Sequence, residues 1–188
     1  MKLASRLQVL VLTLHLGALA LALAPPIFFG VVVAPAVFQV LPTRDMAAAL
    51  QSPVLSRLCL MSQVSFGVLF VTGWLLTRDG AAKVTRSLLT RFPILGFFAA
   101  LVIRQLLIPP IDRIREEAPG LIDTLPMADP SRALLDRYHR LSTGFFSVEI
   151  AAALVLLVVT AQLLSQWKAA PPPPAAVRPP APKVLDLG

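Results

Sequence analysis

A single acidic side chain lies inside one of the most apolar stretches of this chain. Glu149 is the only ionisable residue between Leu141 and Leu164. A bare charge in the middle of a bilayer costs at least about 2.5–3.5 kcal/mol on insertion scales, so such a residue faces protein and finds a partner. Ionisable residues in this position often mark proton or cation pathways. We therefore expect Glu149 to lie inside a helix bundle with a polar neighbour.

Arg104 is the predicted neighbour. The apolar run that holds Arg104 ends on the side of the membrane where the run that holds Glu149 begins. Arg104 lies about four residues inside that boundary and Glu149 about eight, a difference in depth of roughly 6 Å at the helical rise of 1.5 Å per residue. The sequence thus predicts an Arg104–Glu149 ion pair or shared hydrogen bond. The pair could fix helix register or form a proton- or cation-sensitive site, and a protonated Glu149 is a further alternative.

Other polar residues complete a candidate cluster. It comprises His15, Arg104, Tyr138, His139, Ser142 and Glu149. His15 lies about eight residues into the first apolar run, where a histidine with a packing role is favoured over a ligand or a proton relay. We expect His139 at the opposite surface of the membrane.

The sequence gives no support for a metal site, a cofactor or a catalytic centre. Cys59 is the only cysteine, which excludes an internal disulfide and a site with several thiolate ligands. His15 and His139 are the only histidines and are expected too far apart to hold one metal ion or haem. No nucleophile–base set or phosphate loop can be assembled. We expect no enzyme, no cofactor and no metal; a haem- or copper-binding membrane protein is a third alternative.

The composition is typical of an integral membrane protein. Of the 188 residues, 56% are hydrophobic and only 14% are charged, and the mean hydropathy is +0.77. A soluble domain is about half apolar and a quarter charged. The net charge of +7 comes from basic residues at the ends of apolar runs, a pattern that suits lipid headgroups and membrane topology. The expected partner is therefore the lipid bilayer and not nucleic acid.

Four apolar stretches are long enough for membrane helices, which need roughly 20 residues each. They predict an all-α fold, a polytopic antiparallel bundle of four transmembrane helices in residues 7–168, with spans at about 7–30, 54–77, 88–108 and 141–164. We expect the first span to kink or end near Pro25 and Pro26 and to continue as an interfacial segment.

Prolines and capping residues suggest the other helix limits. Ser52 and Pro53 resemble the N-cap and first turn of the second helix. The third helix is expected to stop at Pro109 and Pro110. The fourth is expected to start outside the lipid, at the Asp129–Pro130 pair.

Lysine and arginine counts indicate the orientation of the spans. Basic residues concentrate at the N-terminus, in the loop between the second and third spans, and in the C-terminal tail. The positive-inside rule then places residues 1–6 and the tail in the cytoplasm, and we expect a bacterial cytoplasmic (inner) membrane. The N-terminus also resembles a secretory signal, but its apolar stretch is longer than usual and a proline follows the candidate site at Ala24. The proline-rich residues 169–188 are expected to be disordered.

Small residues indicate how the helices pack. In lipid, helices associate through close contact at small residues and through interhelical polar contacts. The predicted packing residues are Ala18, Ala22, Ser62, Ser65, Gly96 and Ala100. The Gly96-xxx-Ala100 step is also the face expected to join copies of the chain, should it form homo-oligomers.

Three segments carry a family resemblance. They are LHLGALALALAPPIFFGVVVAPAVFQVLP, the proline at Pro109 after the third span, and RYHRLS at the start of the fourth. Together they resemble the transmembrane protein 205-like family, which in bacteria corresponds to the domain of unknown function 4149. The resemblance implies about four transmembrane helices, and through relatives linked to tolerance of toxic drugs it hints at trafficking or export. This chain has Phe145 and Phe146 where relatives often carry an asparagine.

The sequence predicts a small, non-enzymatic integral membrane protein with a structural or accessory role. Examples of such a role are support of another membrane complex, envelope homeostasis or stress and toxicant tolerance, with other membrane proteins or further copies of the chain as partners. The alternative is a transporter or channel component for a small solute or ion that uses the Arg104–Glu149 pair. That alternative requires an oligomer, because four helices seldom enclose a substrate path alone.

Overall fold

The computed structural model describes residues 5–78, 80–118, 122–126 and 128–169. All regular structure in these ranges is helical, which confirms the predicted all-α fold. The elements are α1 (Ser5–Phe28), the π-helical turn η1 (Phe29–Val33), α2 (Ala34–Val40), α3 (Arg44–Thr77), α4 (Lys83–Val102), the π-helical turn η2 (Ile103–Leu107), α5 (Ile108–Glu117), the 3-10 turn η3 (Ile122–Thr124) and α6 (Pro130–Ala169). The expectations for residues 1–4 and for the tail from 170 to 188 lie outside the described residues.

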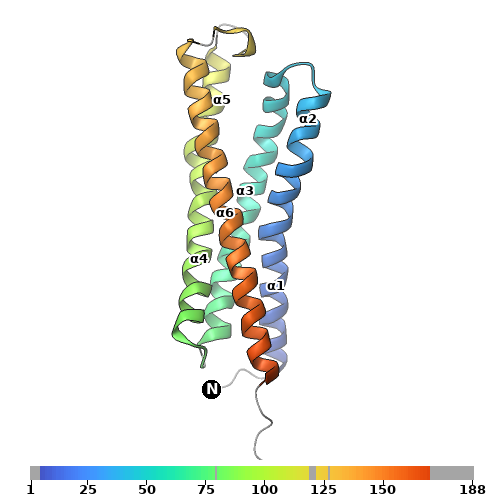
Figure 1. Cartoon of the computed structure of the whole chain (residues 1–188), viewed down its shortest axis with the longest axis vertical. Helices are drawn as coiled ribbons and strands as arrows, with labels where there is room; N and C mark the ends of the chain where they lie inside the picture. Colours follow the sequence, from blue (N-terminus) through green and yellow to red (C-terminus); the bar gives the residue numbers. More distant parts are fainter. Residues whose placement is uncertain (1–4, 79, 119–121, 127, 170–188) are drawn as a thin grey trace, which may run out of the picture.

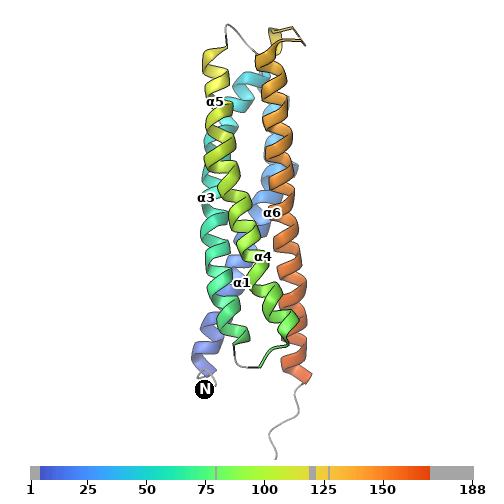
Figure 2. The same ribbon diagram turned by 90° about the vertical axis from the view of Figure 1, so that its left-hand side faces the viewer.

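These elements form a bundle of four long rods: α1–η1–α2, α3, α4–η2–α5 and α6 (Figure 1). The helix α1 packs against α3 and α6, and α4 packs against the same two helices. Neighbouring rods run antiparallel, with α3 and α6 on a diagonal, as Figure 2 shows with α4 between them and nearest the viewer. We call the end of the bundle where α1 starts and α6 finishes the terminal end, and the opposite end, at η3, the distal end.

All four rods are long and apolar enough to cross a membrane. They cover Arg6–Val40, Arg44–Thr77, Lys83–Glu117 and Pro130–Gln166, between 34 and 37 residues each. At 1.5 Å per residue each rod is roughly 50–55 Å long, whereas the hydrocarbon core of a bilayer is about 30 Å thick. Large apolar side chains such as Val31, Val64 and Leu106 are more than 60% exposed on the outer surface, which suits lipid better than water. A rod of this length that crosses a bilayer extends beyond its hydrocarbon core.

The second helix starts earlier than the sequence predicted. Thr43 caps α3, because its hydroxyl oxygen accepts a hydrogen bond from the Met46 N–H at 3.2 Å. The predicted cap, Ser52, lies within α3 together with Pro53. A Ser-Pro pair has the same signature inside a membrane helix as at a helix start, since membrane helices tolerate proline. The fourth helix does begin at Pro130, where Asp129 Oδ1 accepts a hydrogen bond from the Ser131 N–H at 2.8 Å.

Prolines lie within the helical rods and do not end them. Pro25 and Pro26 lie inside α1, and the expected interfacial segment is helical as far as Val40. Pro109 and Pro110 lie in the helical rod rather than after it, so the predicted stop was wrong. Proline has no N–H to donate to the preceding turn, and each π-helical turn directly precedes a proline-bearing helix start. The wider turns rearrange the backbone hydrogen bonds so that the rods continue.

The terminal half of the bundle is closely packed. Gly96 makes room for the buried ring of Phe66, since a Cβ at Gly96 would overlap that ring. Gly73 lets α3 approach α4, because a Cβ there would lie 2.6 Å from the carbonyl oxygen of Leu89. The predicted packing residues are all buried within this one chain: Ala18, Ala22, Ser62, Ser65, Gly96 and Ala100. The Gly96–Ala100 face therefore packs inside the chain and is not free to join copies of it.

Replacement of Gly96 tests this packing. We expect Gly96→Ala to lower the free energy of unfolding by about 1–3 kcal/mol, as overpacked cores do, measured by thermal or denaturant unfolding in mild detergent. Phe66→Leu in the same chain should restore part of the loss. Gly144→Ala is the control, because its Cβ would meet nothing within 4 Å and alanine is favoured in helices by up to about 1 kcal/mol. Equal effects of the two alanines would contradict this account.

Candidate functional site

The predicted polar cluster is divided among three levels of the bundle. His15 lies in the terminal half, Glu149 lies near the middle, and His139 and Ser142 lie toward the distal end. Thr160, which contacts His15, follows Glu149 by 11 residues on α6, or roughly 16 Å along the axis at 1.5 Å per residue. The residues therefore do not act on one another directly as a single site.

His15 connects three helices in the terminal half. Its ring is fully buried, with Nδ1 2.8 Å from the Thr72 hydroxyl of α3 and Nε2 3.1 Å from the Thr160 hydroxyl of α6. Thr72 donates its own proton to the Val68 carbonyl at 2.7 Å, so its oxygen must accept from His15 Nδ1–H. Nε2 then accepts from Thr160, and both nitrogens of a neutral imidazole are satisfied. The ring acts as a polar cross-link between helices, as a packing histidine does.

Removal of this cross-link should destabilise the bundle. Side-chain hydrogen bonds in membrane proteins contribute about 0.6 kcal/mol on average and at most about 1.7. We therefore expect His15→Leu to lower the free energy of unfolding in detergent by about 1–3 kcal/mol for its two bonds. The matched control is His139→Leu, because His139 is exposed and surface changes stay within about 0.5 kcal/mol. Similar losses in both variants would contradict the role of His15.

Glu149 points into the bundle and has no hydrogen-bond partner among the described residues. Its side chain is fully buried, and neither carboxyl oxygen makes a hydrogen bond. Ser62 of α3 faces it across the diagonal, but the Ser62 hydroxyl is also without a hydrogen bond. The carboxyl group is thus sheltered from lipid, as predicted, and is beside a hydroxyl. Surroundings with no counter-charge accommodate the neutral acid far better than the carboxylate.

The predicted Arg104–Glu149 pair is not formed. Neither oxygen of Glu149 makes a hydrogen bond in the described part of the chain, and Arg104 is only half-buried. The reason lies in the rotation of the rod: Ile103, fully buried against Cys59 and Ala100, occupies the inward position next to Arg104. The prediction compared only the depth of the two residues along the helix axes, and similar depth does not bring two side chains together when one of them turns away from the interior.

A double-mutant cycle tests the absence of the pair. We expect Arg104→Gln to change the free energy of unfolding equally in the native chain and in the Glu149→Gln chain, with a coupling below about 0.5 kcal/mol, as for independent sites. Glu149→Gln alone should leave the fold intact, because the amide has the shape of the neutral acid. A coupling above about 1 kcal/mol would instead support the pair.

The remaining predicted residues lie on the distal part of α6. Tyr138 is half-buried and packs against the small apolar cluster around Cys59. Ser142 is buried and donates to the His139 carbonyl at 2.9 Å, so its hydroxyl is satisfied within its own helix. The side chains of His139 and Ser142 both border a cavity. That cavity is the feature that sequence reasoning missed.

The distal cavity has a volume of about 400 Å³ and lies between α2, α3, α5 and α6. In Figure 1, α5 and α6 stand apart from α2 and α3 at this end of the bundle. The directions of the chain put Phe29, Leu55, Ile103 and Phe146 at the floor, toward the middle of the bundle. Both π-helical turns contribute to this floor. Such turns are frequent at functional sites.

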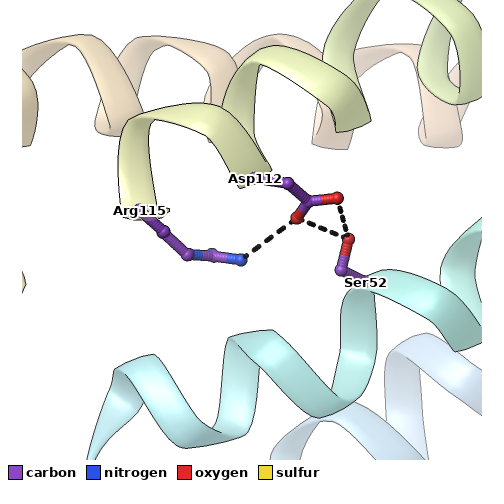
Figure 3. A network of polar contacts seen from close by, with 3 residues as sticks. All are labelled: Ser52, Asp112 and Arg115. Carbon is purple, nitrogen blue, oxygen red and sulfur yellow. Dashed lines mark hydrogen bonds and ion pairs between the residues drawn. The ribbon is translucent and has the colours of Figure 1, made fainter. Parts of the chain in front are cut away.

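The rim of the distal cavity is polar. A second hollow of about 180 Å³ adjoins it and shares Phe38, Ala48, Ile111, Arg115 and His139 with it. At the rim, Ser52 donates to both oxygens of Asp112, at 2.8 and 3.0 Å, and Arg115 Nη1 lies 3.9 Å from Asp112 Oδ1 (Figure 3). A hollow of this size, apolar below and polar above, has the character of a small-molecule site.

The structure offers no ready-made metal site in the part of the chain that it describes. No three histidine, cysteine, aspartate or glutamate side chains in that part are grouped so that they could hold an ion. Arg115 and the cavity were not foreseen because the arginine lies in a mixed-charge segment, IDRIREE, that resembles an ordinary solvated helix. The prolines that follow the π-helical turns, Pro35, Pro109 and Pro110, were the only signal of this region in the sequence.

Comparison with known proteins does not identify a family for this chain. No protein-family model matches the chain, and no curated protein or solved structure matches it significantly. The resemblance to the transmembrane protein 205-like family therefore stays a prediction from the quoted segments.

Proposed function

We propose that this protein is a non-enzymatic accessory protein of a membrane that holds an amphipathic small molecule in its distal cavity. The observation that carries the proposal is the cavity of about 400 Å³ with an apolar floor and a polar rim. Its volume is within the range of roughly 300–1,000 Å³ that is typical of small-molecule sites. Among the described residues that line it, no hydroxyl is hydrogen-bonded to a basic side chain, and binding is the chemistry that these walls support.

The position of the cavity relative to the bilayer supports this function. The charge-free part of α3, residues 58–77, is about the 20 residues that cross the hydrocarbon, and it lies between Arg57 and Arg78. Arg57 is exposed, as suits a side chain that reaches the headgroups. The distal boundary of the hydrocarbon then lies close to Leu55, which is at the cavity floor. The cavity thus begins where lipid chains end and rises through the headgroup layer.

We infer further that both termini are cytoplasmic, as the positive-inside rule indicates. The distal cavity then opens on the opposite side, and a bacterial inner membrane fits this arrangement. An accessory role in stress or toxicant tolerance agrees with a protein that binds amphiphiles, and kinship with the transmembrane protein 205-like family would fit it. The alternative of a transporter or channel component was based on the Arg104–Glu149 pair, and that pair is not formed.

Filling the cavity tests the proposal. Ala48 borders both hollows, so Ala48→Trp should occupy the space, whereas Ala49→Trp points away, since Ala49 is exposed. The probe is an alkyl alcohol with a photoreactive diazirine on its chain, added to the protein in phosphatidylcholine vesicles. We expect the native chain and Ala49→Trp to be labelled at cavity-floor residues, and Ala48→Trp to lose this labelling.

Peptide mapping by mass spectrometry reads out the labelled positions, and the thermal midpoint of each variant verifies its fold. Labelling confined to lipid-facing residues in the native chain would overturn the proposed function.

A further inference from the structure

Arg115 is the only arginine, lysine, aspartate or glutamate among the described residues that line the distal cavity. It comes from α5, whose course places it at the rim, about 12 residues or roughly 18 Å above Ile103 at the floor, at 1.5 Å per residue. Only 22% of the side chain is exposed. A largely buried cation thus borders a hollow whose other walls are mostly apolar.

The guanidinium of Arg115 is not satisfied by the protein. Arginine carries five N–H donors and no acceptor. In the described part of the chain, Arg115 Nε is buried without a hydrogen-bond partner. Its Nη1 lies 3.9 Å from Asp112 Oδ1, which is longer than a hydrogen bond. The guanidinium thus makes no hydrogen bond in the described part of the chain, and its terminal nitrogens, unlike the enclosed Nε, are the donors that an acceptor in the cavity would meet.

The acidic groups near Arg115 are hydrogen-bonded to other residues and act on the guanidinium only through their charge. Asp112 accepts from the Ser52 hydroxyl with both oxygens, which draws its carboxylate toward α3, as Figure 3 shows. Asp45, at the neighbouring hollow, accepts from the Ile122 N–H at 2.6 Å. These bonds hold the two carboxylates in place at the rim, and neither closes a bidentate pair with the guanidinium.

We propose that the distal cavity binds a single-chain amphiphile with an anionic headgroup, a carboxylate or a phosphate monoester, supplied by the membrane. This inference rests on the proposed function and names its ligand. The planar guanidinium suits both headgroups, because each can accept two parallel N–H bonds from it. The alkyl chain extends down to Leu55, Ile103 and Phe146. The neighbouring hollow is lined by Arg44 and Arg132 and by Asp45 and Asp136, so with Arg115 and Asp112 the rim carries three arginines and three aspartates, and the unpaired donors of Arg115 are what favour an anion there.

The experiment compares headgroups on one photoreactive chain. Diazirine-bearing alkyl probes with a carboxylate, phosphate, trimethylammonium or hydroxyl headgroup are added to the full chain in phosphatidylcholine vesicles, at an alkaline pH where the carboxylate is ionised. We expect both anionic probes to label the cavity floor about ten-fold more efficiently than the alcohol, equivalent to about 1.4 kcal/mol, and the trimethylammonium probe less than the alcohol.

Variants of Arg115 identify the cause of the preference. Arg115→Gln should remove the anion preference while labelling by the alcohol persists, which also shows that the variant is folded. Arg115→Lys should retain part of the preference. Arg113→Gln is the matched control: it makes the same charge change on the same helix, at an exposed position that does not line the cavity, and should behave as the native chain.

The outcomes separate this inference from the proposed function. Equal labelling of the floor by all four probes, or an anion preference that survives Arg115→Gln, would overturn the anionic ligand and leave amphiphile binding in place. Labelling by the carboxylate probe alone would restrict the ligand to carboxylates and by the phosphate probe alone to phosphates, each in support of the proposal. Absence of floor labelling with every probe would overturn both.

Discussion

Helices surrounded by lipid are held together by shape and by hydrogen bonds, because lipid chains solvate apolar side chains as well as other helices do. In this protein that constraint is met in the terminal half. The ring of Phe66 fills the space that Gly96 leaves, and His15 joins Thr72 and Thr160 on two other helices. These contacts hold α1, α3, α4 and α6 at close range, and the remainder of the bundle is arranged around them.

The distal half follows a different principle. The proline pairs and the two π-helical turns keep the rods helical while altering their course, and the rods that meet tightly below stand apart above (Figure 1). Polar links at the rim, such as Ser52 with Asp112, then replace close apolar packing. The cavity thus lies at the end of the bundle where polar contacts and the prolines of α2 and α5 replace close apolar packing.

The sequence was sufficient for the number of helices, their antiparallel order and their small-residue faces. Gly96 and Ala100, for example, recur at a helical interval, and that interval alone indicates a packed face. The sequence was misleading at Pro53 and Pro109. Rules from water-soluble helices treat proline as the start or end of a helix, whereas a membrane helix can continue through it. The cavity could not be predicted, since its size depends on distances between rods that only tertiary packing sets.

Site residues were predictable in kind but not in pairing. His15 was predicted to have a packing role, yet nothing in the sequence states that Thr72 and Thr160 are the two residues that it contacts. Arg104 and Glu149 were matched by depth, and the error was rotational, because Ile103 takes the inward place. Depth along a helix follows from residue count, while the direction of a side chain depends on how each rod is turned against its neighbours.

The unpaired acid also bears on how a ligand lies in the cavity. Glu149 follows Phe146 of the floor by three residues, or roughly 4.5 Å along α6, and its carboxyl group makes no hydrogen bond in the described part of the chain. An anionic headgroup placed at the floor would meet the apolar side chains of Phe29, Leu55, Ile103 and Phe146, with an acid one turn below. At the rim the same headgroup would meet the open donors of Arg115. Both ends of the cavity therefore favour one orientation of the amphiphile, with its headgroup toward the distal surface and its alkyl chain toward Glu149. The neutral form of Glu149 is compatible with an apolar neighbour.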